Sequence, residues 1–337
     1  MNHRLRRYVR VAFSLGLGLL LLWLITRGQD IEQIMSEFRS ADYRLIFLAM
    51  LCAFCSHFLR AVRWNMLIRT MGYRTSSRQT FYAVMTGYLA NLAIPRMGEI
   101  TRCVTLSKST ATPFNALAGT VVAERVFDVF SLFAIVFITI ISQFGFLKNF
   151  LDKLFWQPMV SRGLENWIPL LAIGLGMLAI GLAILFFVRN KLRNPLENSF
   201  FHKIKRQLRG FIDGVKTIRH LRGKAWFVLY TFLIWGLYFM TVYLCFFALQ
   251  ATSHLGLFAG LTLLAVGSLG ILAPVPGGIG TYHFLTIITL TELYSIASEP
   301  ATSYAYITHA TQIIVNIIGG TASWIILSLQ NKSRLRS

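Results

Sequence analysis

The stretch from residue 116 to residue 142, ALAGTVVAERVFDVFSLFAIVFITIIS, decides the class of this protein. It is long and apolar enough to cross roughly 30 Å of hydrocarbon as one helix. Similar runs recur along the whole chain of 337 residues, of which 55% are hydrophobic and only 14% charged. Soluble domains carry about 25% charged residues, so the distribution predicts an all-α polytopic membrane protein. The expected spans are about 8–26, 44–67, 116–142, 167–188, 225–249, 255–273, 279–296 and 303–328.

The chain has a net charge of +20, and its basic residues flank the apolar spans. This distribution is typical of membrane topology rather than of a nucleic-acid-binding surface. Basic residues gather at the N-terminus, after the second span, between residues 189 and 224, and at the C-terminus. If these clusters share the cytoplasmic face, 26 of the 33 basic residues lie there and six lie outside. We therefore expect a protein of the cytoplasmic membrane with both termini inside and no nucleic-acid partner.

Residues 79–112 contain helix-breaking positions such as Pro95 and Gly98 and do not resemble ordinary spans. A single crossing in this segment would move the basic loop 189–224 to the outside. The segment is therefore predicted to enter and leave from the cytoplasmic side, as a re-entrant hairpin or an interfacial pair. Such broken backbone is tolerated at membrane depth only against protein or a wet cavity. Eight spans then remain.

Glu124, Arg125 and Asp128 lie near the start of the span 116–142. Glu124 and Asp128 are four residues apart and share one helix face. Charged groups at membrane depth are costly unless they are paired or hydrated. These residues therefore either line a cavity that meets a polar headgroup or form an ion pair that locks neighbouring helices.

The second candidate site follows the break at Pro95. Glu99 and Arg102 fall one turn apart on the helix expected to start near Gly98. Arg102 and Arg96 are candidates to hold a phosphate through the planar guanidinium group. The alternative is an interfacial turn with a solvated salt bridge.

The third candidate site is the stretch PVPGGIGTYH at 274–283, where prolines and glycines prevent a continuous helix. Its predicted hinge residues are Pro274, Pro276, Gly277, Gly278 and Gly280. His283 either lines a cavity there or is simply hydrogen-bonded. Residues 89–102 and 269–283 share the order of apolar run, break and polar helix start. That order is typical of transporter repeats, although a similarity this short also arises by chance.

Two further features have simple interpretations. Arg60-x-x-Arg63-Trp64 ends the second span and is predicted to anchor lipid phosphates, with the arginines reaching the interface. The four cysteines and seven histidines show no zinc-like spacing, so no metal site and no cofactor are expected.

Taken in chain order, four motifs resemble the lysylphosphatidylglycerol synthase transmembrane region family, also called flippase-like or YbhN-like. The motifs are Arg60-x-x-Arg63-Trp64, Pro95-Arg96-x-Gly98-Glu99-x-x-Arg102, Glu124-Arg125-x-x-Asp128 and Pro276-Gly277-Gly278-x-Gly280. The resemblance covers about residues 10–330. In the family's best-known members a cytoplasmic transferase makes lysylphosphatidylglycerol, and the membrane part is thought to flip it to the outer leaflet.

The resemblance implies a single flippase-like transmembrane domain over residues 1–337, without a soluble catalytic domain. The longest predicted loop, 189–224, has 36 residues and is too short for a transferase. His283 departs from the acid that relatives often have after the glycine motif, which implies a different headgroup.

Three functions are compatible with these residues. The first is a translocator of a phospholipid or lipid-linked precursor, with anionic or phosphate-bearing membrane lipids as partners and with no enzymatic activity. No Walker motif is present, so movement would be downhill or ion-coupled. The second is a membrane transferase acting on a lipid or polyprenyl phosphate, with Glu99 or Asp128 as the base. The third is a non-transporting membrane subunit.

Overall fold

The computed structural model describes residues 3–110, 112–143, 221 and 223–334, and every regular element in these ranges is helical. The predicted span 167–188 lies outside the described residues. The helices are α1 (His3–Thr26), α2 (Ile31–Ser40), α3 (Tyr43–Thr70), α4 (Ser77–Ala93), α5 (Met97–Ser109), α6 (Phe114–Ser142), α11 (Lys224–Ala248), η2 (Gln250–Thr252), α12 (Leu257–Leu272), η3 (Pro276–Gly278), α13 (Thr281–Ile288), η4 (Thr289–Leu293) and α14 (Ser298–Arg334).

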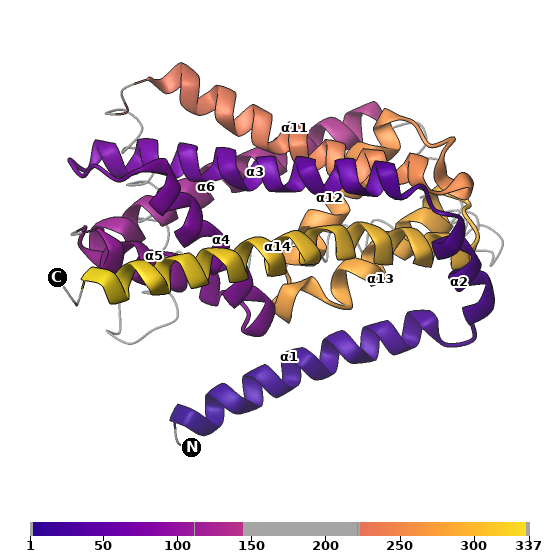
Figure 1. Cartoon of the computed structure of the whole chain (residues 1–337). Helices are drawn as coiled ribbons and strands as arrows, with labels where there is room; N and C mark the ends of the chain where they lie inside the picture. The colour runs from indigo at the N-terminus through magenta and orange to yellow at the C-terminus, as the bar shows by residue number, and fades with distance from the viewer. Residues whose placement is uncertain (1–2, 111, 144–220, 222, 335–337) are drawn as a thin grey trace, which may run out of the picture.

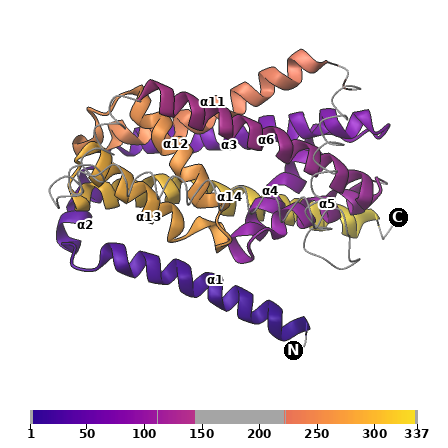
Figure 2. The same cartoon turned by 180° about the vertical axis from the view of Figure 1, so that it is seen from behind.

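Four of the described helices, α3, α6, α11 and α14, are long and apolar enough by length and composition to cross a membrane. They form the body of the molecule in Figures 1 and 2, with α1 along one side. Large apolar side chains on these helices face outward; Phe232 is 75% exposed and Phe133 is 67% exposed. An outward apolar band is what lipid contact requires. The predicted all-α membrane fold is confirmed.

Two pairs of shorter helices form hairpins. The helices α4 and α5 have 17 and 13 residues, so they measure about 25 and 20 Å along their axes, short of a full crossing. They correspond to the re-entrant segment expected at 79–112. The other pair consists of α12, with 16 residues, and α13, with eight residues continued by the π-turn η4.

The prediction of full spans at 255–273 and 279–296 was therefore wrong. Each helix of the pair is about as short as those of the first hairpin, because the chain turns back at the Pro/Gly stretch between α12 and α13. Apolar composition alone cannot show this, since both arms stay apolar up to the turn. The expected sidedness of the termini is unaffected, because a hairpin removes two crossings together.

The two hairpins approach from opposite ends of the bundle. In both views α4 and α5 lie in the half that carries the C-terminus, whereas α12 and α13 lie nearer to α2 (Figures 1 and 2). Their tips meet: a Cβ atom placed on Gly277 in the second break would lie 3.1 Å from Leu92 Cδ2 near the end of α4. The two breaks therefore pack against each other at the tips of the hairpins.

The two breaks have the same local geometry. Ile94 (φ −138°, ψ 123°) and Ala273 (φ −56°, ψ 145°) each precede a proline and leave the helical region, as a residue before proline favours. A left-handed residue then follows in each break, Arg96 at φ 62° and Gly277 at φ 58°. Glycine adopts this conformation without penalty, whereas arginine is uncommon there.

In each hairpin, close contacts at glycine residues hold the two helices against each other. In the first, Gly98 lies directly against the carbonyl oxygen of Gly87, leaving no room for a side chain. In the second, a Cβ atom on Gly270 would lie 2.8 Å from the Cα atom of Tyr282. The helix α14 crosses α4 in the same way, since a Cβ atom on Gly320 would lie 2.7 Å from the Cβ atom of Leu89.

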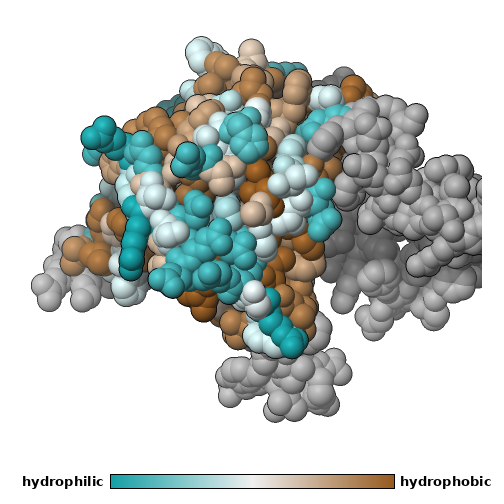
Figure 3. All heavy atoms as spheres, turned by 90° about the vertical axis from the view of Figure 1, so that its right-hand side faces the viewer, coloured by the Kyte–Doolittle hydropathy of each residue, from teal (hydrophilic) through white to brown (hydrophobic). Residues whose placement is uncertain are grey.

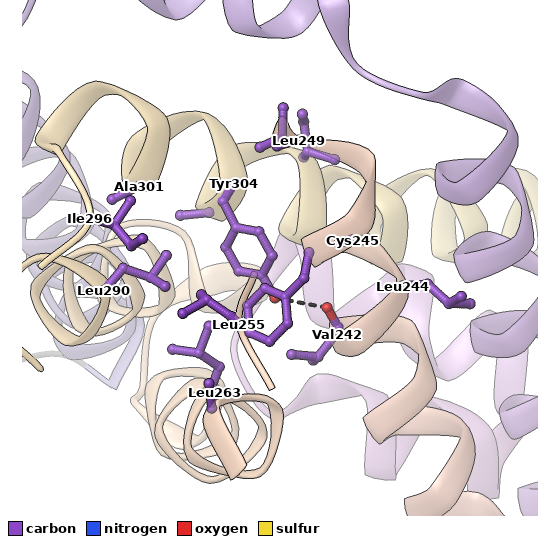
Figure 4. Close-up of a cluster of buried hydrophobic side chains, with 14 of the residues drawn as sticks. Val242, Leu244, Cys245, Leu249, Leu255, Leu263, Leu290, Ile296, Ala301 and Tyr304 are labelled. Atoms are coloured by element: carbon purple, nitrogen blue, oxygen red, sulfur yellow. Dashed lines mark hydrogen bonds between the residues drawn. The ribbon is translucent and has the colours of Figure 1, made fainter. Parts of the chain in front are cut away.

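The main hydrophobic core joins α11, α12, the segment after α13, and α14 (Figure 4). At its centre the Tyr304 hydroxyl donates to the carbonyl oxygen of Val242 at 2.9 Å, which ties α14 to α11. Leu263 and Leu290 pack in the same cluster. Figure 3 looks onto the end of the bundle that carries α2, where hydrophilic residues gather beside apolar ones. The core thus fixes the second hairpin between two spanning helices.

Candidate functional site

The candidate site is built around the buried carboxylate of Glu124 on α6. Arg60 Nη1 lies 3.0 Å from Glu124 Oε1, Arg63 Nη2 lies 3.3 Å from the same oxygen, and Arg102 Nη1 lies 2.9 Å from Oε2. Arg60 and Arg63 are one turn apart on α3, and Arg102 lies on α5. One carboxylate thus joins three helices.

Asp128, one turn further along α6, completes the cluster. Arg63 Nη2 lies 2.6 Å from Asp128 Oδ1, and Arg60 Nη1 lies 3.0 Å from Oδ2. The partly exposed Arg125 pairs with Glu99 of α5 at 3.0 Å and approaches Asp128 at 3.8 Å. The i,i+4 spacing predicted that Glu124 and Asp128 share one helix face, and in the structure both acids on that face contact α3.

We call this set the charged cluster: Arg60, Glu99, Arg63, Arg102, Glu124, Arg125 and Asp128. Its four arginines face three carboxylates, so the cluster carries a formal charge of +1. The helix α11 supports it through neutral groups: Arg60 Nε donates to the Tyr238 hydroxyl at 3.3 Å, and Arg63 Nη1 donates to Thr231 Oγ1 at 3.0 Å. Removing charges from water is costly, and the mutual pairing offsets that cost.

Arg102 has unused hydrogen-bonding capacity. Its Nε and Nη2 atoms are buried and have no hydrogen-bond partner among the described residues, while its guanidinium carbon lies 4.7 Å from the centre of the Trp64 ring. Beside it is a cavity of about 10 Å³ lined by Tyr88, Asn91, Gly98 and Arg125 among others. That space holds at most one water molecule, so the site is closed in this structure.

The structure brings five of the predicted site residues together, namely Glu99, Arg102, Glu124, Arg125 and Asp128. Arg60 and Arg63 join them; both are buried, and their guanidinium groups bind carboxylates instead of reaching toward the lipid surface. Arg96 is exposed at the first break and lies outside the charged cluster. One apolar span carries an R-x-x-R pair and another carries an E-x-x-x-D pair. Because these pairs have opposite charges, the sequence contained enough information to predict that the two spans contact each other.

His283 lies at the second break, away from the charged cluster, and is 4% exposed. Its Nδ1 accepts a hydrogen bond from the amide of Gly280 at 3.3 Å. Sequence reasoning missed His309 on α14, whose Nε2 lies 2.8 Å from the carbonyl oxygen of Gly277 and whose ring lies 4.7 Å from that of His283. The feature of the sequence that could have indicated His309 is the presence of an ionisable histidine within the apolar span 303–328.

The predicted hinge residues also lie at this break. Pro276 and Gly278 are buried, Pro274 is exposed, and Gly277, Gly278 and Gly280 all have positive φ angles. Gly280 lies directly against the carbonyl oxygen of Gly18 on α1, where any side chain would collide. Within the described ranges no group of three or more His, Cys, Asp or Glu side chains is arranged to hold a metal ion.

These features define a helical integral membrane protein with two opposed, broken hairpins, the first of which contributes Glu99 and Arg102 to a buried cluster of positive net charge. Residues 10–320 match the family described as the lysylphosphatidylglycerol synthase TM region, and the chain belongs to that family. The family resemblance found in the four sequence motifs is thereby confirmed.

Three relatives are similar to this chain in sequence. The chain is 25% identical to the glycosyltransferase AglD of Haloferax volcanii over 97% of its own length but only 56% of that protein. It is 24% identical to a UPF0104 membrane protein of Pyrococcus horikoshii, covering 82% of this chain and 84% of that one. A UPF0104 membrane protein of Methanocaldococcus jannaschii is 27% identical over 35% of this chain and 37% of its own. No solved structure matches the chain significantly.

Proposed function

We propose that this protein moves the phosphate-bearing headgroup of a phospholipid or lipid-linked precursor across the membrane. The observation that carries the proposal is the environment of Arg102. This guanidinium group is buried in a cluster of net positive charge, and two of its nitrogens have no partner among the described residues. A phosphate is the complementary ligand, because it accepts charge-assisted hydrogen bonds from a planar guanidinium group.

The first hairpin supplies the route in this proposal. A flipping headgroup needs polar surroundings while its acyl chains remain in hydrocarbon. Glu99 and Arg102 lie on α5 behind the first break, and the 10 Å³ space beside them is too small for a headgroup. The tip formed by α4 and α5 must therefore move relative to α6 to admit one. Irregular backbone next to a polar site is the arrangement that transporters use for such motion.

The location and sidedness of the protein form part of the same proposal. The basic clusters favour a cytoplasmic membrane protein with both termini inside. The hairpin of α4 and α5 would then enter from the cytoplasmic side, and that of α12 and α13 from the outer side. The partners would be anionic or phosphate-bearing lipids, handled by a single transmembrane domain.

The test is a flipping assay with the purified full chain in liposomes. Fluorescent phosphatidylglycerol, phosphatidylethanolamine and a polyprenyl phosphate are placed in both leaflets, and an impermeant reductant bleaches the outer one. We expect the protected fraction to fall below that of empty vesicles for at least one of these lipids. Equal protection with and without protein, for every headgroup, contradicts the proposal.

A membrane transferase is the second candidate, because the matched Haloferax volcanii protein is named a glycosyltransferase. The candidate bases, however, are both engaged: Asp128 contacts Arg60 and Arg63, and Glu99 contacts Arg125. A carboxylate held by arginines is a weak proton acceptor. Product formation from labelled sugar or aminoacyl donors, lost on Glu99→Gln, would favour this candidate over translocation.

A further inference from the structure

A larger cavity, of about 310 Å³, opens between α3 and α11 at the end of the bundle that carries the C-terminus. We call it the α3–α11 cavity. Its walls come from the last turns of α3, the start of α4 and the start of α11. The residues that matter to the argument are Asn65, Met66, Arg69, Ser77, Trp226 and Tyr230.

The lining combines a cation, aromatic rings and an apolar wall. No carboxylate lies within ion-pair distance of Arg69 in the part of the chain that the structure describes, unlike the arginines of the charged cluster. Trp226 is 59% exposed, and its ring lies 6.2 Å from that of Tyr230. Asn65 is buried and donates to the carbonyl oxygen of Thr75 at 3.0 Å, which fixes the loop behind the cavity.

The position of the cavity fits an amphiphile. Arg69 is the penultimate residue of α3 and Trp226 is the third residue of α11, so both lie at the ends of membrane-spanning helices. Tryptophan and arginine at such ends mark the level of the lipid headgroups. The volume is at the lower limit of small-molecule sites, so it suits a headgroup whose acyl chains stay outside.

The α3–α11 cavity and the charged cluster are contacted by neighbouring residues of α11. Trp226 and Tyr230 line the cavity, whereas Phe227 and Thr231, each the next residue along α11, face the cluster. Phe227 is 1% exposed; its ring packs against that of Phe127 at 4.9 Å and lies 5.6 Å from the guanidinium carbon of Arg63. Phe227 therefore lies on the side of α11 that faces the cluster, next in sequence to Trp226 of the cavity lining.

We propose that the α3–α11 cavity is the first binding site for the phosphate-bearing headgroup of a membrane lipid, with Arg69 as its counter-charge. Phe227 is the barrier that the headgroup passes to reach the charged cluster. The inference rests on the proposed translocation, since it names the site from which that movement starts. It concerns residues that none of the four sequence motifs contains.

Binding is measured with the full chain in dodecyl maltoside micelles, which contain no phosphate, by calorimetric titration with dihexanoyl phosphatidylglycerol. We expect Arg69→Gln to weaken binding about tenfold, because it removes one charge-assisted contact, and Arg69→Lys to weaken it less. The matched control is Arg44→Gln, an exposed arginine at the other end of α3, which should bind like wild type. Phe227→Leu should leave the affinity unchanged and raise the flipping rate. Melting temperatures verify that each variant is folded.

Wild-type affinity in Arg69→Gln would overturn the inference. Equally tight binding of glycerol 3-phosphate would also overturn it, since the cavity would then take free phosphate esters rather than lipids. The proposed function fails separately: Arg69-dependent binding without any flipping refutes translocation but leaves the binding site in place. If Arg69→Gln flips lipid at the wild-type rate although its lipid binding is no longer measurable, only this inference is refuted and the proposed translocation stands.

Discussion

Arg102 Nη1 on α5 forms an ion pair with Glu124 on α6 at 2.9 Å, while the other guanidinium nitrogens of Arg102 are buried and have no hydrogen-bond partner in the described structure. Glu124 keeps Arg60 and Arg63 as partners if Arg102 is removed. Arg102 is thus an arginine that the charged cluster can lose without leaving a carboxylate unpaired. This separates a role in ligand binding from a role in holding the helices together.

Arg102→Gln is therefore expected to abolish most lipid movement and to change stability little. Loss of a charge-assisted contact to phosphate should reduce the flipping rate about tenfold or more in the liposome assay. The melting temperature in detergent should stay within a few degrees of wild type. The matched control is Arg96→Gln, an exposed arginine at the same break. Equal losses in both variants would contradict a special role for Arg102.

Asp128→Asn should behave in the opposite way. It leaves Arg60 and Arg63 with one carboxylate between them and raises the formal charge of the cluster from +1 to +2. An uncompensated buried charge costs about 3–5 kcal/mol, so we expect a clear fall in thermal stability. The double variant Arg63→Gln, Asp128→Asn returns the formal charge to +1 and should recover part of the loss. A double-mutant cycle from detergent unfolding measures the coupling, and strict additivity would contradict it.

Gly98→Ala should open the first hairpin. The added methyl group would meet the carbonyl oxygen of Gly87 and lie 2.6 Å from Asn91 Nδ2, so the arms must separate. We expect a loss of about 1–3 kcal/mol, measured as a lower melting temperature. Gly119→Ala on α6 is the control, because its methyl group meets nothing within 4 Å. It should be neutral or slightly stabilising.

Much of this arrangement was predictable because it depends on local chemistry. The helix ends at Ile94 and Ala273 follow from the proline after each, and the pairing of α6 with a basic helix follows from the cost of unpaired charge in lipid. What local chemistry cannot give is the direction of the chain after a break. Hydropathy predicts two full spans for the apolar helices α12 and α13, because it contains no information on the close packing of Gly270 against Tyr282.

The assignment of Arg60 and Arg63 to the lipid surface failed for a related reason. An arginine near the end of an apolar run reaches the interface when it has no partner and stays inside when a carboxylate faces it. Which of the two happens depends on contacts to Glu124, more than 60 positions away. The contact of His309 with Gly277 is equally non-local. Sequence spacing therefore located the charges but not their partners.

The topology has its own test. In a cysteine-free background, Ser253→Cys lies beyond the end of α11, and Met71→Cys lies at the end of α3 on the opposite side of the bundle; both positions are exposed. With both termini inside, an impermeant thiol reagent should label Ser253→Cys in intact cells. It should label Met71→Cys only after permeabilisation. The reverse labelling pattern would show that the orientation of the protein is the opposite of the one proposed.

The contact between the two hairpin tips tests whether they move. A Cβ atom on Gly277 would lie 4.0 Å from the Cα atom of Leu92, so cysteines at both positions are close enough for a disulfide. If translocation requires the tips to separate, oxidation of Leu92→Cys, Gly277→Cys should stop lipid movement and reduction should restore it. Each single variant, treated with the same oxidant, controls for the strain of a side chain at a left-handed position. Undiminished flipping by the fully cross-linked protein would show that the headgroup passes without separation of the two breaks.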